Sequence, residues 1–247
     1  MVVQQTVDTA RLEETMAHLG LDERRWPVVA AAALTFGAGA LDVLALTHLG
    51  GVFASVMTGN LALMGLGLAR ADTTAIVHTV VAVLGYAAGV ALGSRVTGVR
   101  LPRSPAWPPR VTTVLVVQLM LQCGLAVGWF AAHAAPAGGL QLALLAAAAA
   151  SMGLQSAAVR GIGVPLATTY LTGALTGLIA NRTVASPGGS DAAGVAALLA
   201  AVVGAGCGGV MLTSAPTVTP LLCIGPLAVV VAAAQWLRHD AWIPIHG

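Results

Sequence analysis

The stretch GGVFASVMTGNLALMGLGLA, Gly50–Ala69, decides how this chain folds. It is almost wholly apolar, and it has the ~20 residues that a helix needs to cross the ~30 Å hydrocarbon core of a bilayer. Its centre reads Met57-Thr58-Gly59-Asn60, which suits a lipid-facing helix poorly. The segment therefore either crosses the membrane or enters it and turns back, and the topology of the chain depends on which of these it does.

The composition is that of an integral membrane protein. Of the 247 residues, 57% are hydrophobic and only 8% are charged, whereas soluble domains carry roughly 25% charged residues. The mean hydropathy is +0.89. Because the long apolar runs lack the alternation of a barrel strand, the sequence predicts an all-α bundle of helices in contact with the lipid bilayer.

Several classes of function are not supported by the sequence. The net charge of +2 gives no indication of nucleic acid binding. Cys123, Cys207 and Cys223 each lie inside an apolar run and are typical of small buried hydrophobic residues. We find no zinc-ligand spacing, no phosphate-binding glycine loop and no plausible Ser-His-Asp set. We therefore expect no catalytic residue, no metal, no cofactor and no enzyme activity.

Eight apolar runs follow a polar N-terminal segment. They are roughly Pro27–Leu49, Gly51–Ala69, Ala75–Ser94, Val111–Phe130, Leu140–Val159, Val164–Ala180, Ala192–Thr213 and Val218–Leu237. We expect residues 1–26 to form a cytoplasmic segment, residues 27–238 to form one transmembrane domain, and residues 239–247 to form a C-terminal tail. A cleavable signal peptide is not expected, because the first apolar run is long enough to be a full span.

The arginines favour six crossings rather than eight. If the second and sixth runs re-enter and the N-terminus is cytoplasmic, nine arginines face the cytoplasm: Arg24, Arg25, Arg95, Arg100, Arg103, Arg110, Arg160, Arg182 and Arg238. Only Arg70, next to Asp72, then lies outside. Eight crossings place either the arginine-rich loop around RLPRSPAWPPR (Arg100–Arg110) or five other arginines outside. The positive-inside rule thus predicts six spans, with both termini cytoplasmic.

The two halves of the chain, about residues 27–133 and 138–238, resemble each other. At an offset of 114 residues, the matching pairs are Gly39 with Gly153, Asp42 with Ser156, and Thr58-Gly59 with Thr172-Gly173; after a longer loop, Gly85 and Gly89 align with Gly204 and Gly208. Each half then has three spans, and an odd number of crossings inverts the second half relative to the first. The sequence thus predicts a 3+3 inverted repeat with two short broken or re-entrant helical segments.

Broken helices at matching positions of inverted repeats indicate a transport site near the midplane of the membrane. At Thr58-Gly59, glycine can adopt backbone angles that other residues resist. Asn60 would then cap a half-helix that begins at Leu61 and points its free N–H groups inward. The second Thr-Gly pair supplies a weaker counterpart. The alternative is a continuous helix whose threonine and glycine pack against neighbouring helices.

Asp42 is the strongest single indication of function. It lies about seven residues from the outer end of the first run, or ~10 Å at 1.5 Å per residue. A charged aspartate at the centre of a membrane helix costs ~2.5–3.5 kcal/mol, and such residues mark ion or proton pathways. Two interpretations stay open: Asp42 couples protons or binds solute, or its carboxyl group caps the backbone of the broken segment.

Other polar side chains lie inside the apolar runs. Gln155 either meets the site across the pseudo-twofold axis or bonds to neighbouring helices, and Gln118 and Gln122, at i and i+4, have the same two interpretations. Thr169 and Tyr170 offer hydroxyl groups to a cavity. The predicted substrate or ion pathway comprises Asp42, Thr58, Gly59, Asn60, Gln155, Thr169, Tyr170, Thr172 and Gly173.

Four motifs resemble the YoaK-type family of bacterial inner-membrane proteins, also called domain of unknown function 1275. They are the Gly/Asp element ending at Asp42, Met57–Asn60, Gly153–Gln155 and Thr169–Gly173. The resemblance covers about residues 27–238. It implies a multi-pass protein of the inner (plasma) membrane with about six helices and implies no activity.

We expect a membrane transporter or channel for a small solute, with its site between the two Thr-Gly breaks. The alternative is a non-transporting sensor or assembly protein that acts through its basic cytoplasmic loop, Arg95–Arg110. Glycine-rich helix faces permit a homodimer.

Overall fold

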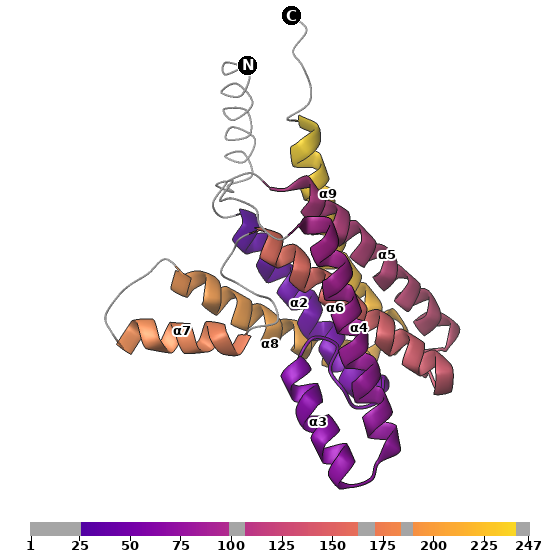
Figure 1. Ribbon diagram of the computed structural model, residues 1–247. Helices are drawn as coiled ribbons and strands as arrows, with labels where there is room; N and C mark the ends of the chain where they lie inside the picture. Colours follow the sequence, from indigo (N-terminus) through magenta and orange to yellow (C-terminus); the bar gives the residue numbers. More distant parts are fainter. Residues whose placement is uncertain (1–25, 99–106, 163–170, 184–189, 241–247) are drawn as a thin grey trace, which may run out of the picture.

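The computed structural model describes residues 26–98, 107–162, 171–183 and 190–240, and over these residues every regular element is a helix (Figure 1). The helices are α2 (Trp26–His48), α3 (Met57–Ala69), α4 (Thr73–Thr97), α5 (Pro109–Ala131), α6 (Gly138–Ile162), α7 (Leu171–Thr183), α8 (Ser190–Ser214), the short 3₁₀ helix η1 (Pro216–Val218) and α9 (Pro220–Asp240). Six of them, α2, α4, α5, α6, α8 and α9, are long and apolar enough to cross a membrane. The predicted all-α architecture of six spans plus short segments is confirmed.

The two short helices lie where the sequence places its interrupted segments. Both α3 and α7 have 13 residues. At 1.5 Å per residue, α3 and the described part of α7 are each about 20 Å long, which is less than the ~30 Å of hydrocarbon that a spanning helix must cross.

The interruption before α3 lies earlier than the sequence predicted. Gly50 and Gly51 have positive φ angles of 102° and 75°, and the backbone is not helical again until Met57. Left-handed angles of this kind are readily adopted by glycine and end a helix. The predicted break at Thr58-Gly59 and the predicted helix start at Leu61 are therefore wrong, since both residues of the Thr-Gly pair lie in the first turn of α3.

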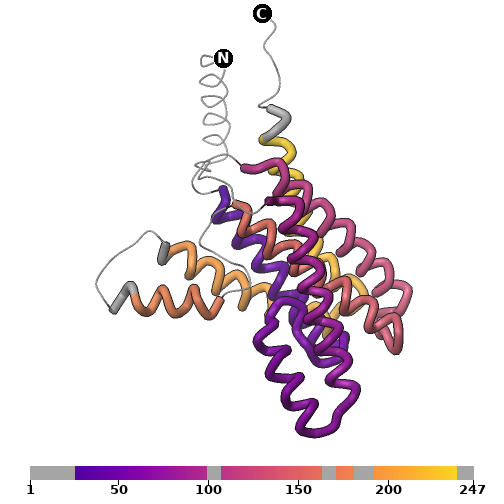
Figure 2. The backbone as a smooth tube through the Cα atoms, in the orientation of Figure 1, coloured from indigo at the N-terminus to yellow at the C-terminus, as the bar shows by residue number. Residues whose placement is uncertain are grey.

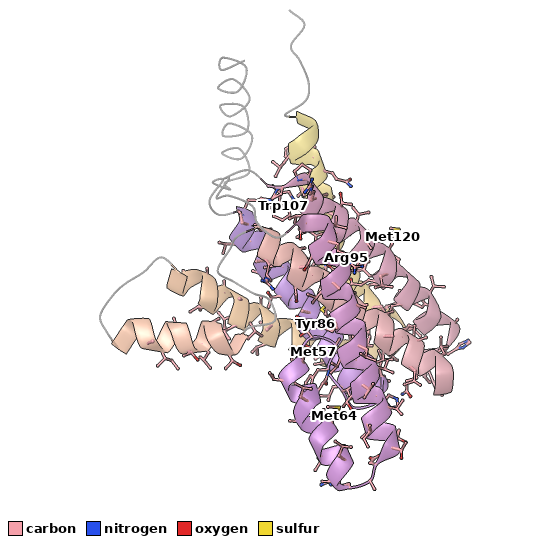
Figure 3. All side chains as sticks on the ribbon, in the orientation of Figure 1. Met57, Met64, Tyr86, Arg95, Trp107 and Met120 are labelled. Carbon is pink, nitrogen blue, oxygen red and sulfur yellow. The ribbon has the colours of Figure 1, made fainter. Side chains whose placement is uncertain are left out.

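The spans alternate in direction, and their ends fall into two groups. At one end, here called the Trp26 end, the rings of Trp26 and Trp107 lie 5.7 Å apart. At the other, here called the His48 end, the Trp129 indole N–H donates to the carbonyl oxygen of Pro216 over 2.9 Å. Figure 3 shows Arg95 and Trp107 toward the same end of the bundle, with Tyr86 about midway along α4.

The arginines of the described spans follow this division. Arg95, Arg110, Arg160 and Arg238 lie near the Trp26 end of α4, α5, α6 and α9, while Arg70 lies in the turn between α3 and α4 at the opposite end. This is the distribution that six crossings predict.

Close helix pairs form the centre of the bundle. The most extensive contacts join α4 to α6 and α2 to α8 (Figures 1 and 2). Glycine permits the close approach: a Cβ atom at Gly85 would lie 2.9 Å from the carbonyl oxygen of Ala146, and one at Gly208 would lie 3.0 Å from Cα of Ala40. These two glycines therefore serve helix packing within the chain.

Two buried apolar clusters fill the bundle. The Trp26-end cluster includes Leu34, Leu115 and Leu154. The His48-end cluster includes Leu125 and Met152 and covers the inner faces of α2, α5 and α6 toward that end.

The two short helices form hairpins with the spans that follow them. Helix α3 packs on α4, and α7 packs on α8, so that both hairpins project from the central bundle (Figure 2). Their outward faces carry exposed apolar side chains, including Leu61, Leu68, Leu175 and Ile179. Such faces suit contact with lipid.

Candidate functional site

Asp42 binds the interrupted backbone that follows its own helix. Its Oδ1 accepts a hydrogen bond from the Ser55 backbone N–H over 2.7 Å, and its Oδ2 accepts one from the Ser55 hydroxyl group over 2.5 Å. Asp42 lies six residues before the end of α2 at His48, or about 9 Å along the helix axis. The loop of residues 49–56 therefore doubles back alongside α2 rather than continuing beyond it.

Asn60 holds the same loop from the other side. Its Oδ1 accepts from the backbone N–H of Phe53 over 2.8 Å, and its Nδ2 donates to the carbonyl oxygen of Phe53 over 2.7 Å. The Asn60 side chain is fully buried, and the N-cap position of α3 is Val56. Asn60 is thus a partner for the loop backbone, and the prediction that it caps a helix beginning at Leu61 is wrong.

These side chains supply hydrogen bonds that a helix would have supplied. Buried backbone N–H and C=O groups are costly without partners, and the cost is several kcal/mol per group in hydrocarbon. Asp42, Ser55, Asn60 and the Phe53 backbone form what we call the loop cluster. Of the two interpretations of Asp42, the structure shows the cap on the broken segment.

A second set of contacts fixes the start of the loop. Gln141 donates from Nε2 to the His48 carbonyl oxygen over 2.9 Å, and its Oε1 lies 3.3 Å from Nε2 of His78. The His78 Nδ1 lies 2.8 Å from the carbonyl oxygen of Thr74. A Cβ atom at Gly50 would overlap the His78 ring. Helices α2, α4 and α6 are therefore joined at the point where the loop begins.

Gln155 belongs to a different group of residues. Gln118 donates from Nε2 to Oε1 of Gln155 over 2.8 Å, and Gln155 donates from Nε2 to the carbonyl oxygen of Leu34 over 3.2 Å. Leu34 precedes Asp42 by eight residues, which is about 12 Å along α2. Together with Gln122, one turn after Gln118, these residues form what we call the glutamine cluster. Of the predicted site residues, Asp42 and Asn60 therefore belong to the loop cluster, and Gln155 belongs to the glutamine cluster at a different depth.

The remaining predicted residues that the structure describes lie outside both clusters. Thr58 is exposed on the first turn of α3, and a Cβ atom at Gly59 would lie 3.2 Å from the ring of Phe53. Thr172 and Gly173 are exposed on α7, which packs against α8. The structure does not bring the two Thr-Gly pairs together. Thr169 and Tyr170 lie outside the described residues.

Ser156, the counterpart of Asp42 in the second half, joins two spans. Its Oγ accepts a hydrogen bond from the Tyr86 hydroxyl group over 2.9 Å, which links α6 to α4. In the described ranges, no group of three or more His, Cys, Asp or Glu side chains converges to hold a metal ion, and Cys123, Cys207 and Cys223 have free thiols.

Sequence reasoning missed Ser55 and Gln141. Ser55 gains its role only because the loop turns back to Asp42, 13 residues earlier in the chain, and Gln141 lies 93 residues from the carbonyl group that it binds. Neither spacing has a periodic signature. A polar residue inside an apolar run was the only available signal.

Comparison with known proteins places the chain in a family. No solved structure matches it. It is 29% identical over 147 residues to the UPF0700 transmembrane protein YoaK of Bacillus subtilis (strain 168); the match covers 59% of this chain and 63% of that protein. The profile of the DUF1275 family, described as proteins of unknown function, matches residues 30–233. The motif resemblance is thereby confirmed, and the chain is a polytopic membrane protein that belongs to the DUF1275 family.

Proposed function

We propose that this protein is a transporter or channel for a small solute, built as a 3+3 inverted repeat. The observation that carries the proposal is the non-helical backbone of residues 49–56, folded back to the depth of Asp42. Irregular backbone at membrane depth is tolerated only where protein buries it or where it lines a water-filled cavity. In transporters, such interruptions lie at the substrate site.

Matching element order supports the inverted repeat. In each half a long helix is followed by a short helix that packs on the next long helix: α2, α3 and α4 in the first half, and α6, α7 and α8 in the second.

Exchanged helix contacts support it as well. Exchanging the halves turns the α2–α8 pair into the α6–α4 pair, and the α2–α9 pair into the α6–α5 pair; all four pairs are in contact. A Cβ atom at Gly39 would meet Ala201 and Ala205, whereas one at Gly153 would meet Tyr86 and Val90. Ala201 and Ala205 follow Tyr86 and Val90, respectively, by 115 residues.

The same contacts favour a revised alignment of the glycines on α4 and α8. A Cβ atom at Gly204 would meet Phe36, and one at Gly89 would meet Ala150, 114 residues later. The equivalent of Gly204 is then Gly89, one helical turn from the Gly85 that the sequence alignment chose. Alanine-rich helices align almost equally well at neighbouring turns, which accounts for the difference.

The two halves differ in chemistry at the loop. The first half has Asp42 and Asn60, whereas the corresponding positions of the second half have Ser156 and Ala174. We therefore assign the permeation pathway to the side of the bundle where the first loop is anchored. Asp42 would hold the loop in place through Ser55. The rate at which solute passes the loop would therefore depend on the Asp42 carboxylate.

Solute flux tests this proposal. The full chain would be reconstituted in liposomes, and stopped-flow light scattering would follow swelling with glycerol, urea, glycine and water. We expect at least one solute to enter faster than in protein-free liposomes, and we expect Asp42→Asn to slow it by tenfold or more, because the amide can accept from Ser55 with only one oxygen.

Asp72→Asn is the matched control for that substitution. Asp72 is an exposed aspartate that accepts from the Ala75 N–H at the start of α4, and asparagine caps a helix about as well. Flux in this variant should equal that of the unmodified protein. If no solute enters faster than in protein-free liposomes, the transport proposal fails, and the non-transporting sensor or assembly protein becomes the better hypothesis.

A further inference from the structure

A layer of buried polar side chains separates the two apolar clusters. Its members are Thr35 on α2, Gln118 and Gln122 on α5, and Ser151 and Gln155 on α6, and each is at most 3% exposed. On all three helices, these residues lie where the chain passes from the Trp26-end cluster to the His48-end cluster. The layer therefore lies near the middle of the bundle, where a membrane is least hospitable to polar groups.

Most of the layer is satisfied by hydrogen bonds within the protein. The Thr35 and Ser151 hydroxyl groups donate to carbonyl oxygens of their own helices over 2.7 and 2.8 Å. The amide of Gln118 donates to Gln155, whose amide donates to Leu34. Two acceptors are left: Oε1 of Gln118 and Oε1 of Gln122 are buried and have no hydrogen-bond partner.

Rotating the amide groups of Gln155 and Gln118 does not remove the deficit at Gln118. If Gln155 were flipped, its oxygen would face the carbonyl oxygen of Leu34, which can only accept. The Leu34 carbonyl therefore fixes the orientation of Gln155, and Gln155 in turn fixes that of Gln118. The free oxygen of Gln118 is a consequence of helix packing, and the free oxygen of Gln122 lies one turn away on the same face of α5.

Unpartnered buried acceptors are uncommon in folded proteins, because each loses its bonds to water without replacement. An occupant that donates hydrogen bonds removes the deficit. The layer carries no charged side chain, and the nearest carboxylate on α2, Asp42, lies seven residues after Thr35 and is bound to Ser55. Carbonyl oxygens repel an anion, and two neutral amides replace a cation's hydration shell poorly. The chemistry therefore selects an uncharged donor.

We propose that Gln118 and Gln122 form the selectivity site of the pathway and bind a small uncharged molecule through its N–H or O–H groups, as in urea or a small polyol. This inference rests on the proposed transport function and names the class of solute. Gln155 is a positioning residue, because it orients Gln118 and has no free acceptor of its own.

The test compares Gln122→Met with the unmodified full chain in liposomes, using urea and glycerol as probes. Methionine has a similar length but no strong acceptor, and no intramolecular hydrogen bond of the Gln122 oxygen is lost. We expect urea or glycerol flux to fall about tenfold, as the loss of one hydrogen bond to a permeating solute predicts. Melting temperature in detergent should be unchanged or higher, because an unpaired acceptor is removed.

The matched control is Gln235→Met, which changes an exposed glutamine on α9. Its flux should equal that of the unmodified protein. If Gln122→Met conducts both probes at the unmodified rate, the site holds at most a structural water and the proposal is overturned. If Gln122→Met lowers the melting temperature by several degrees, the oxygen has an intramolecular partner, which also overturns it.

A binding measurement separates this inference from the proposed function. The melting temperatures of the unmodified protein and of Gln122→Met would be compared across a series of acetamide concentrations, so that the general effect of the co-solvent cancels. If no solute is transported but acetamide stabilises only the unmodified protein, the transport function fails and the binding site stands. If neither flux nor stability depends on Gln122, the binding site fails too.

Discussion

At the scale of single residues, the loop between α2 and α3 depends on side chains that replace the hydrogen bonds of a helix. Asp42 engages both donors of Ser55, and Asn60 engages both backbone groups of Phe53. The sequence revealed that Asp42 and Asn60 were unusual, because polar groups in apolar runs are expensive. It did not reveal their partners, since these contacts exist only after the loop has turned back.

Replacement of Asn60 should be more harmful than replacement of a neighbouring exposed residue. Asn60→Ala leaves the N–H and C=O groups of Phe53 without partners, at ~1–3 kcal/mol each. For a chain of this size, each kcal/mol lowers the melting temperature by roughly 2–4 °C. We therefore expect a fall of about 4–24 °C in detergent, measured by differential scanning fluorimetry.

Thr58→Ala is the control for that measurement, because Thr58 lies in the same turn of α3 and its side chain is exposed. It should change the melting temperature by less than about 2 °C, as surface substitutions usually do. Equal effects of the two substitutions would mean that Asn60 does not hold the loop.

At the scale of elements, hydropathy predicted the positions of the eight apolar segments well, and the arginines separated the six spans from the two short segments. Each span is a single long apolar helix whose length is dictated by the bilayer, so the signal is contained within one run. The position of the break was predicted less well. The Gly50-Gly51 pair, and not Thr58-Gly59, adopts the left-handed angles, and a sequence of many glycines does not indicate which of them leave the helix.

The close contact of α4 with α6 makes a prediction at this scale. A Cβ atom at Gly89 would overlap the carbonyl oxygen of Ala150, a backbone atom that cannot move aside. Gly89→Val should therefore separate the two helices, cost at least ~3 kcal/mol and greatly reduce the yield of monodisperse protein in size-exclusion chromatography.

Gly206→Val is the control, because it has the same effect on helix propensity and adds the same side-chain volume without a close helix contact. It places the same side chain on α8, where a Cβ atom would meet nothing within 4 Å. Its yield should be close to that of the unmodified protein. A normal yield of Gly89→Val would show that α4 and α6 are not packed as described.

At the scale of the whole molecule, the arginines predicted the number of crossings, because charge acts on each loop independently of the packing. The pairing of spans was beyond the sequence: α2 packs along α8, and α4 along α6, through small residues that occur throughout the chain. The glutamine cluster could not be predicted for the same reason, because its contacts form only when α2, α5 and α6 are packed together.

The topology predicts that both ends of the segment before α4 label from one side of the membrane. In a background without cysteine, Gly51→Cys and Ala71→Cys should react with a membrane-impermeant maleimide from the same side, whereas Arg110→Cys, at the Trp26 end of α5, should react from the opposite side. Labelling of Ala71→Cys from the side of Arg110→Cys would mean that residues 51–69 cross.

The pairing of α2 with α8 and of α4 with α6 also governs how the chain matures during synthesis. When α2–α5 have entered the membrane, the helices that α2 and α4 contact most, α8 and α6, have not yet been synthesised. The backbone beside Gly39, for example, is that of Ala201 and Ala205. Until the second half follows, the glycine faces of α2 and α4 therefore contact lipid instead of another helix. Both apolar clusters contain residues of both halves, so the interior is complete only after the second half has been made.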